Sequence, residues 1–356
     1  MNVRRAGSVA LAVVVVAAAA ACGSSGSDKT VTVNAGGGNK SDSSVLVGAG
    51  STFVAPLVQQ WEADYVKSPA AVTVTYGAIG SGGGVDQITA RTVDFGASDA
   101  PLSADQAAAC KGCIQIPWSL GAVAITYNVK GLQNKIHLTG PVIADMFMGK
   151  VTSWNDPEIA KLNPGVSLPD THITPVYRSD GSGTSFAFTD WLTKVSPDWA
   201  NNVGTSTQPP FPTGTGAEHS SGVVAAVQAT DGAVTYVDLA YVQANDLQYA
   251  LLQNAAGNYP EPGIKSVIAA AKVGTSNPDG SISLVNPPAS AADAYPDATF
   301  TYVIVPQDSP KASTLKDFLK YAIGPTGQAF GPDLGYPKLP ASIVASDQQL
   351  IDKIGS

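Results

Sequence analysis

The folded part of the chain opens with Val45-Leu46-Val47-Gly48-Ala49-Gly50-Ser51-Thr52-Phe53, and this stretch decides the fold class. Its first three residues are the apolar run of a short strand. The residues that follow carry apolar side chains at helical spacing, at Val54, Leu57, Val58, Trp61 and Tyr65. A glycine-rich loop therefore joins a strand directly to a helix. We expect further strands at 72–76, 121–127 and 299–305, and further helices at 188–195 and 315–322, which predicts an α/β architecture.

The helix that follows this first loop is a candidate anion site. Ser51 or Thr52 is placed to cap it, and Pro56 falls in its first turn, where proline is tolerated. The free N–H groups and the partial positive charge of a helix start suit an anion. Phe53 stands where a dinucleotide fingerprint needs a third glycine, so a dinucleotide is disfavoured.

Two more segments have the same design. One is Gly80-Ser81-Gly82-Gly83-Gly84, before a helix expected from about Val85, although a flexible turn would also explain it.

The other segment precedes the helix expected at 188–195 and reads Tyr177-Arg178-Ser179-Asp180-Gly181-Ser182-Gly183-Thr184-Ser185. Thr184 or Ser185 is placed to cap that helix. The forked donors of Arg178 match an oxyanion, and Asp180 is close enough in sequence to hold the guanidinium. The alternative is a surface arginine beside a polar turn.

The composition narrows the class of partner. The chain has 356 residues, which suggests about two domains. Its net charge of −8 argues against nucleic acid. The same charge repels anions at long range, so capture of an anion depends on local donors and dipoles.

A fourth element is Asp94-Phe95-Gly96-Ala97-Ser98-Asp99-Ala100-Pro101, in which Asp99 sits in a turn of small residues. Together with the three helix starts, it resembles the periplasmic-type phosphate-binding protein of bacterial high-affinity, ABC-type phosphate uptake systems. The resemblance runs from about Leu46 to the C-terminus and includes Lys161-Leu162-Asn163-Pro164-Gly165. It implies a class II type of periplasmic-binding-protein fold, in which two α/β lobes are joined by a double-crossover hinge. Residues 45–128 plus 299–356 would form lobe 1, and residues 129–298 would form lobe 2.

The resemblance also implies a set of phosphate contacts and no cofactor or metal. Backbone or hydroxyl donors would come from Ser51, Thr52, Phe53, Ser81, Ser182, Gly183 and Thr184. Arg178 would supply the positive charge, Asp180 would orient it, and Asp99 would accept a hydrogen bond from the proton that phosphate carries. Gly82 replaces a second serine that is frequent in the family. The implied partner is the transmembrane permease, served by a monomer.

Physical chemistry supports this role for Asp99. Phosphate near neutral pH carries a proton and sulfate does not, so a buried carboxylate accepts a hydrogen bond from phosphate and repels sulfate. Two alternatives remain open at this stage: a binding protein for another oxyanion, and a phosphate-ester hydrolase that uses Ser182 with His219 as base.

The N-terminus predicts export. Arg4 and Arg5 precede the apolar run Val9 to Ala21, so residues 1–21 are expected to be a signal peptide. Cys22 follows a lipoprotein-like cleavage box. A lipid on Cys22 would anchor the chain to the outer face of the cytoplasmic membrane, and residues 22–44 would form a flexible tether. An ordinary cleavage site with an incidental cysteine is the alternative. In an oxidising compartment Cys110 and Cys113 are expected to pair, with a redox motif or half a metal site as alternatives.

Overall fold

The computed structural model describes residues 45–69, 72–132, 135–277 and 281–356. The expected signal peptide, the tether and Cys22 lie outside the described residues. Within the described residues, none of the helices combines the length and the apolar character that a membrane span requires.

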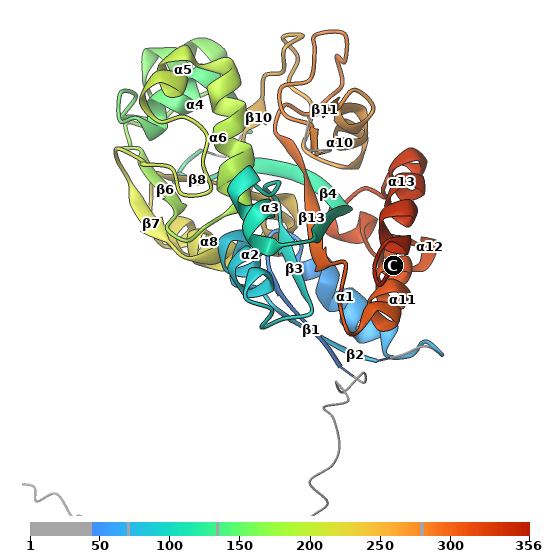
Figure 1. The fold of residues 1–356 in the computed structure, drawn as a ribbon. Helices are drawn as coiled ribbons and strands as arrows, with labels where there is room; N and C mark the ends of the chain where they lie inside the picture. Colours follow the sequence, from blue (N-terminus) through green and yellow to red (C-terminus); the bar gives the residue numbers. More distant parts are fainter. Residues whose placement is uncertain (1–44, 70–71, 133–134, 278–280) are drawn as a thin grey trace, which may run out of the picture. The chain divides into compact units, whose positions relative to one another are not determined.

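One mixed sheet organises the fold (Figure 1). Its strand order is β2-β1-β3-β13-β4-β8-β6-β7, and β9 pairs with β4 beside this path. In that order the strands are β2 (Thr73–Gly77), β1 (Val45–Gly50), β3 (Phe95–Ser98), β13 (Ala298–Pro306), β4 (Cys113–Asn128), β8 (Ala233–Asp238), β6 (Thr174–Arg178), β7 (Thr215–Ala217) and β9 (Gln248–Tyr249). Two short pairs lie outside it: β5 (His137–Leu138) with β10 (Leu251–Leu252), and β11 (Thr275–Ser276) with β12 (Ile282–Ser283).

Strand β4 connects the two halves of this sheet. Its first part, Cys113 to Ala122, pairs with β13, whereas Val123 to Asn128 pair with β8. On one side of this junction β1 runs parallel to β2 and β3. On the other side β6 runs parallel to β7 and β8. The sheet therefore contains two groups of parallel strands, each of which ends in its own set of loops.

Helices pack around each half of the sheet (Figure 1). On the β1–β3 side they are α1 (Ala55–Tyr65), α2 (Ser81–Thr89), α3 (Ala104–Cys110), α11 (Ala312–Ile323), α12 (Pro325–Gln328) and α13 (Ala341–Asp352), with the short 3₁₀ helix η1 (Pro332–Leu334). The remaining helices are α4 (Gly140–Phe147), α5 (Pro157–Leu162), α6 (Gly183–Val195), α7 (Pro197–Asn202), α8 (His219–Ala229), α9 (Leu239–Ala244) and α10 (Ile264–Ala271).

Aromatic side chains fill both halves of the core. Trp61 of α1 lies on Trp118 of β4, with ring centroids 5.1 Å apart. Phe188 of α6 stacks on Tyr236 of β8 at 4.2 Å. All four side chains are buried, so the apolar spacing that predicted α1 and the 188–195 helix marks the faces that pack inward.

The expected helices and strands are found, with two differences. Helix α2 begins at Ser81 and not near Val85, so Gly82, Gly83 and Gly84 lie inside the helix. Residues 215–217 form the short strand β7, which was not among the expected strands and pairs with β6. A disulfide joins Cys110, the last residue of α3, to Cys113, the first residue of β4.

Gly84 lets α2 lie directly on strand β1, which generates a test of the packing. A β-carbon at Gly84 would lie 2.5 Å from the Cα of Gly50 and 2.7 Å from the carbonyl oxygen of Ala49. Both are backbone atoms, which cannot rotate away. We expect Gly84→Ala to lower the free energy of unfolding by about 1–3 kcal/mol in chemical denaturation, as overpacking does.

Gly222→Ala in α8 is the matched control, because its β-carbon would meet nothing closer than 3.6 Å. Its effect should stay within about 1 kcal/mol, since alanine favours a helix more than glycine does. Equal stability of both variants would contradict the direct contact between α2 and β1.

Candidate functional site

The polar residues singled out in the sequence follow the carboxyl ends of the parallel strands. Ser51 follows β1, Ser81 comes after β2 and Asp99 follows β3. From the other group, Arg178 ends β6 and Thr184 lies in the first turn of α6. Carboxyl ends of parallel strands are where open α/β sheets bind ligands. Hydrogen bonds between the two groups bring them together in one buried cluster.

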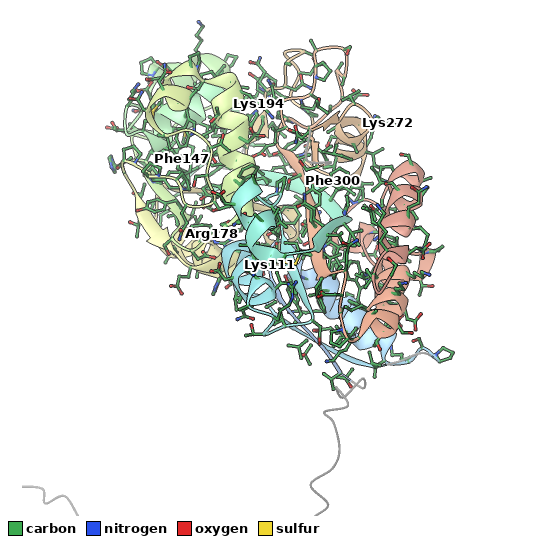
Figure 2. All side chains as sticks on the ribbon, in the orientation of Figure 1. Lys111, Phe147, Arg178, Lys194, Lys272 and Phe300 are labelled. Atoms are coloured by element: carbon green, nitrogen blue, oxygen red, sulfur yellow. A yellow bond between two sulfur atoms is a disulfide. The ribbon has the colours of Figure 1, made fainter. Side chains whose placement is uncertain are left out.

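Arg178 is the positive centre of this cluster, and Figure 2 labels its position in the fold. It is 3% exposed. Its Nε and Nη2 donate to the two carboxylate oxygens of Asp180, the first at 2.6 Å, and its Nη1 donates to Thr52 Oγ1 at 3.1 Å. A guanidinium has five N–H donors. Within the described part of the chain, these three bonds leave two N–H groups that can point at a ligand.

Asp180 holds the guanidinium in this orientation. Burial disfavours the charged carboxylate, but the hydrogen bonds and charge of Arg178 outweigh burial and lower the pKa of Asp180. The backbone N–H of His219 adds a hydrogen bond of 3.0 Å to Oδ1. Asp180 is therefore an ionised partner that fixes the plane of the arginine fork.

Asp99 is the acidic group of the same cluster and is 2% exposed. Its carboxylate accepts hydrogen bonds from the hydroxyls of Ser51, Thr301 at 2.9 Å and Thr184 at 3.3 Å. Its backbone N–H donates to Ser81 Oγ at 3.2 Å. Burial raises the pKa of Asp99 to about 6, although these hydroxyls and the charge of Arg178 oppose the rise. The side chain is thus a hydrogen-bond acceptor whose ionisation is finely balanced.

The helix starts differ from the capping that the sequence suggested. Ser182 caps α6 by accepting from the backbone N–H of Ser185, so the expectation that Thr184 or Ser185 caps this helix is wrong. Val54 is the N-cap of α1 and provides no side-chain cap, so neither Ser51 nor Thr52 has that role. Their hydroxyls are used instead for Asp99 and for Arg178.

The backbone donors divide into two kinds. The N–H of Ser51 donates to the Ala97 carbonyl at 2.9 Å, and that of Phe53 donates to Ser51 Oγ at 3.0 Å. Gly183 and Thr184 occupy the first turn of α6, where N–H groups have no acceptor within the helix. The start of α6 thus offers free donors, whereas the N–H groups of Ser51 and Phe53 in the loop before α1 are already bonded within the chain.

Sequence reasoning missed three residues of the cluster. Thr301 of β13 donates to Asp99, and Ser220 of α8 lies 2.8 Å from Thr52 Oγ1. Asp238 ends β8 and is fully buried nearby. Ser220 had the same signal as the other segments, since His219-Ser220-Ser221-Gly222 is a small polar run that opens a helix. Thr301 and Asp238 sit in apolar strands that carry no such signal.

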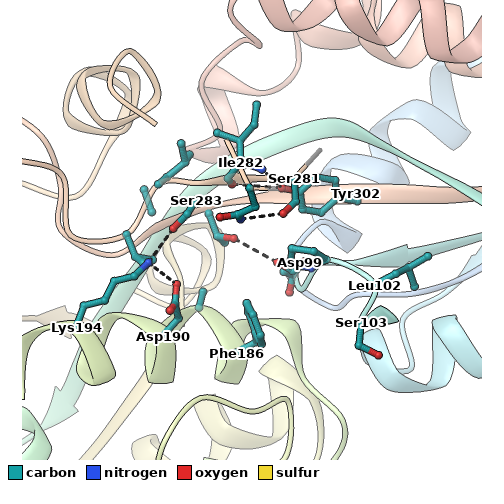
Figure 3. A pocket seen from close by; sticks show the side chains of 17 residues that line it. Asp99, Leu102, Ser103, Phe186, Asp190, Lys194, Ser281, Ile282, Ser283 and Tyr302 are labelled. Atoms are coloured by element: carbon teal, nitrogen blue, oxygen red, sulfur yellow. Dashed lines mark hydrogen bonds and ion pairs between the residues drawn. The ribbon is translucent and has the colours of Figure 1, made fainter. Parts of the chain in front are cut away.

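A separate cavity of about 400 Å³ lies next to the cluster (Figure 3). Of the site residues above, Asp99 alone lines it. Its far wall carries Lys194, which contacts Asp190 at 2.8 Å and Ser283 at 3.0 Å. The buried cationic group and the hydroxyls lie in the Arg178 cluster, so we place the anion site there.

Comparison with known proteins places the chain in a family. Residues 25–326 match the model of a PBP superfamily domain. The phosphate-binding protein PstS of Xylella fastidiosa strain Temecula1 is 40% identical over 313 residues, which cover 86% of this chain and 84% of that protein. PstS of Pasteurella multocida is 35% identical over 312 residues, with 86% and 90% covered.

The chain belongs to the PstS family of phosphate-binding proteins. A solved phosphate-binding protein from Stenotrophomonas maltophilia shares its fold, with a TM-score of 0.64, 20% identity and coverage of 86% and 93%. The predicted α/β fold of two lobes is therefore confirmed. In this PstS-family chain, strand β4 pairs with β13 in its first part and with β8 in its second, and so joins the two halves of the sheet.

The raised pKa of Asp99 predicts that the free energy of unfolding of the ligand-free protein depends on pH. Its pKa is raised from 3.8 to about 6 on folding, so the native state binds more protons than the unfolded state between these values. Stability must then fall as the pH rises through this window. We expect Asp99→Asn to remove up to about 3 kcal/mol of this loss, seen by comparing denaturation curves at pH ~4 and pH ~7.

The direction of the pH effect distinguishes a carboxyl group whose pKa is raised by burial from one whose pKa is lowered by a salt bridge. A carboxylate stabilised mainly by Arg178 would gain stability as the pH rises. An identical pH dependence in wild type and Asp99→Asn would contradict the raised pKa.

Proposed function

We propose that this chain captures inorganic phosphate between its two lobes and delivers it to an ATP-driven membrane permease. The observation that carries the proposal is that one buried cluster contains both the donor fork of Arg178 and the acceptor carboxylate of Asp99. Protonated phosphate offers both the negative oxygens and the hydrogen that such a pair requires. The phosphate-binding proteins among its relatives support the same ligand.

In this proposal the lobes are residues 45–128 plus 299–356 and residues 129–298. The anion would receive donors from Thr52 and Ser81 on the first lobe, and the Phe53 N–H would be shared between Ser51 Oγ and the anion. On the second lobe, Arg178 and the first turn of α6, from Ser182 to Thr184, would supply the rest. Ser51 would act through its hydrogen bond to Asp99, since its own N–H is already bonded to Ala97.

Direct bonds between the two sets of residues support closure around the ligand. Gly82 donates from its backbone N–H to the Gly181 carbonyl at 2.9 Å, and Arg178 reaches Thr52. Each polar contact strengthens when water is excluded, because the effective dielectric falls. Bound phosphate would add the contacts that hold the closed form.

The remaining elements of the proposal concern location and partners. We propose that the chain is exported, anchored by lipid on Cys22, and active as a monomer that binds and does not turn over its ligand. The hydroxyl of Ser182 accepts a hydrogen bond as the N-cap of α6, which fits a structural and ligand-binding serine. Among the described residues, no group of three or more His, Cys, Asp or Glu side chains is arranged to hold a metal ion.

Selectivity tests the proposed ligand. Calorimetry on the purified mature chain should show tight phosphate binding, competition by arsenate, which also carries a proton, and little binding of sulfate. Sites built on such a hydrogen bond discriminate by up to about 10⁴–10⁵-fold. Asp99→Asn should lower phosphate affinity or narrow the gap to sulfate. Sulfate binding as tight as phosphate binding in the wild type would overturn the assignment.

Closure is tested at Gly183. A β-carbon there would lie 2.6 Å from the backbone nitrogen of Asp99 and 2.7 Å from that of Ala100. Gly183→Ala should therefore weaken phosphate binding at least about tenfold by holding the lobes apart. In small-angle scattering the wild type should become more compact with phosphate and the variant should not. An identical scattering profile of the wild type with and without phosphate would rule out the hinge.

A further inference from the structure

Thr301 places a buried hydroxyl group against the carboxyl group of Asp99. It lies in β13 between Phe300 and Tyr302 and is fully buried. Its Oγ1 donates to Asp99 Oδ1 at 2.9 Å. A hydroxyl that is buried without a hydrogen-bond partner costs free energy, so a threonine in this apolar stretch needs such an acceptor. The bond to Asp99 therefore accounts for a polar side chain at position 301.

The register of the sheet sets Thr301 opposite Asp99. Strand β13 runs antiparallel to β3, with Tyr302 opposite Ser98. The next position in the same register brings Thr301 to Asp99, and side chains of directly opposite residues lie close together. Thr299, two residues away on β13, donates from its hydroxyl to the backbone carbonyl of Asp99 at 3.3 Å. Since alternate residues of a strand share a face, one face of β13 holds both the backbone and the side chain of this aspartate.

An irregularity in the sheet marks the position of Thr301. The register of β13 against β4 shifts between Thr301 and Tyr302, which pair with Ser119 and Pro117 respectively. Trp118 is then an extra residue on β4, which is the arrangement of a β-bulge. Bulges turn neighbouring side chains and are frequent next to functional sites. Thr301 thus lies beside the site at a point where the backbone departs from regular pairing.

The two oxygens of the Asp99 carboxylate are used differently. Oδ1 accepts from the hydroxyls of Thr301 and Ser51. Ser51 Oγ itself accepts from the Phe53 N–H at 3.0 Å, so the one hydrogen of Ser51 is directed at Asp99. A carboxylate oxygen has two lone pairs, and the two hydroxyls occupy both lone pairs of Oδ1. Oδ2 accepts from Thr184 at 3.3 Å, which leaves one lone pair of Oδ2 without a partner among the described residues.

We propose that Thr301 is a positioning residue for ligand selectivity: together with Ser51 it occupies Oδ1 of Asp99 and so directs the proton of bound phosphate to Oδ2. This proposal rests on the phosphate function above and names the groups that decide which tetrahedral oxyanion is accepted. A ligand that carries a proton donates it to the remaining lone pair of Oδ2. A fully deprotonated oxyanion such as sulfate meets the same lone pair and is repelled.

Two donors on one oxygen also keep Asp99 in the form that this selectivity requires. Hydroxyl groups that donate to a carboxylate favour its charged form. Burial raises the pKa of Asp99 to about 6, and the hydrogen bonds from Ser51 and Thr301 are the first two causes that oppose the rise. A protonated Asp99 would donate to an anion and would accept sulfate. Loss of the Thr301 hydroxyl should therefore move the ionisation of Asp99 to higher pH and weaken the rejection of sulfate.

Four other titratable or charged groups interact with Asp99. Arg178 is the cation that faces it, and this charge opposes the raised pKa of Asp99. Burial raises the pKa of Tyr76 and of Asp238, with the charge of Asp99 as the next cause. Burial also raises the pKa of Tyr336, with Asp238 and Asp99 among the further causes. All four groups, and the titration of phosphate itself, are common to the variants below, so each variant is compared with the wild type at the same pH.

The test is calorimetric titration of Thr301→Val with inorganic phosphate and with sulfate between about pH 5 and about pH 9, a range that brackets the pKa of Asp99. The measured quantity is the ratio of the two affinities at each pH. In the wild type this ratio should fall as the pH drops toward the pKa of Asp99. In Thr301→Val we expect the fall to begin at higher pH. The ratio near pH ~7 should be about tenfold to a hundredfold smaller, the effect of losing one hydrogen bond to a charged group.

Thr301→Ser should restore the wild-type ratio, because serine keeps the hydroxyl donor. Thr126→Val is the matched control: Thr126 is a fully buried threonine of β4 whose hydroxyl donates to the Gln248 carbonyl at 2.6 Å. It should keep the wild-type ratio at each pH, whatever its loss of stability, which chemical denaturation measures for every variant. If Thr301→Val fails to fold, Thr301→Ala tests the same loss of a donor with a smaller side chain.

Failure of this inference and failure of the proposed function are distinguishable. If Thr301→Val keeps the wild-type ratio at every pH, or loses affinity for both anions equally, Thr301 is only a structural residue and the proposed function stands. If the wild type itself binds sulfate as tightly as phosphate, or binds no phosphate, both proposals fail.

Discussion

A buried guanidinium charge is the constraint on which the rest of the site depends. Removing an arginine from water costs several kcal/mol unless charge and hydrogen bonds replace the water. Here Asp180 occupies one edge of the Arg178 fork and Thr52 receives Nη1. Asp180 is held in turn by the His219 N–H. A β-carbon at position 80 would lie 2.3 Å from Asp180 Oδ2 and 3.3 Å from Arg178 Nη2, so a glycine there leaves room for this ion pair.

The negative net charge of the chain explains why the attraction for an anion must come from groups inside the site. With an overall charge of −8, the protein as a whole does not attract anions. Attraction must be confined to a few ångströms, where a buried cation and helix N-termini act through a low dielectric. A site of this kind holds the ligand by short contacts and is little affected by the ionic strength outside.

The sequence predicted the site residues correctly where the residues that bind a ligand are also the residues that a turn requires. The loops after β1, β2 and β6 were recognisable because small polar residues between a strand and a helix serve both the turn and a ligand. Capping was predicted incorrectly because the hydroxyls of Ser51 and Thr52 have tertiary partners, Asp99 and Arg178, that no local rule reveals. Helix α2 begins four residues before the predicted start at Val85, because its glycines pack against β1 and Gly181. This contact outweighs the poor helix propensity of glycine.

Asp238 and Thr301 could not be found from the sequence for a different reason. Each lies in or at the end of a buried strand among apolar neighbours, where a single polar residue gives no periodic signal. Their positions depend on which strands are neighbours: β13 places Thr301 beside Asp99, and β8, which ends at Asp238, lies between β4 and β6. Strand order in a sheet is a property of the whole chain, and the local pattern does not contain it.

The position of β13 has a consequence for how the molecule is made. This strand lies between β3 and β4 in the sheet, although it follows β4 by about 170 residues along the chain. During synthesis the N-terminal residues appear first, so β3 and β4 lack the strand that lies between them until Ala298–Pro306 has been made. Thr301, which completes the contacts of Asp99, belongs to the strand that arrives late. The acceptor side of the site and the continuous sheet therefore both require β13, and a chain interrupted before this strand would possess neither.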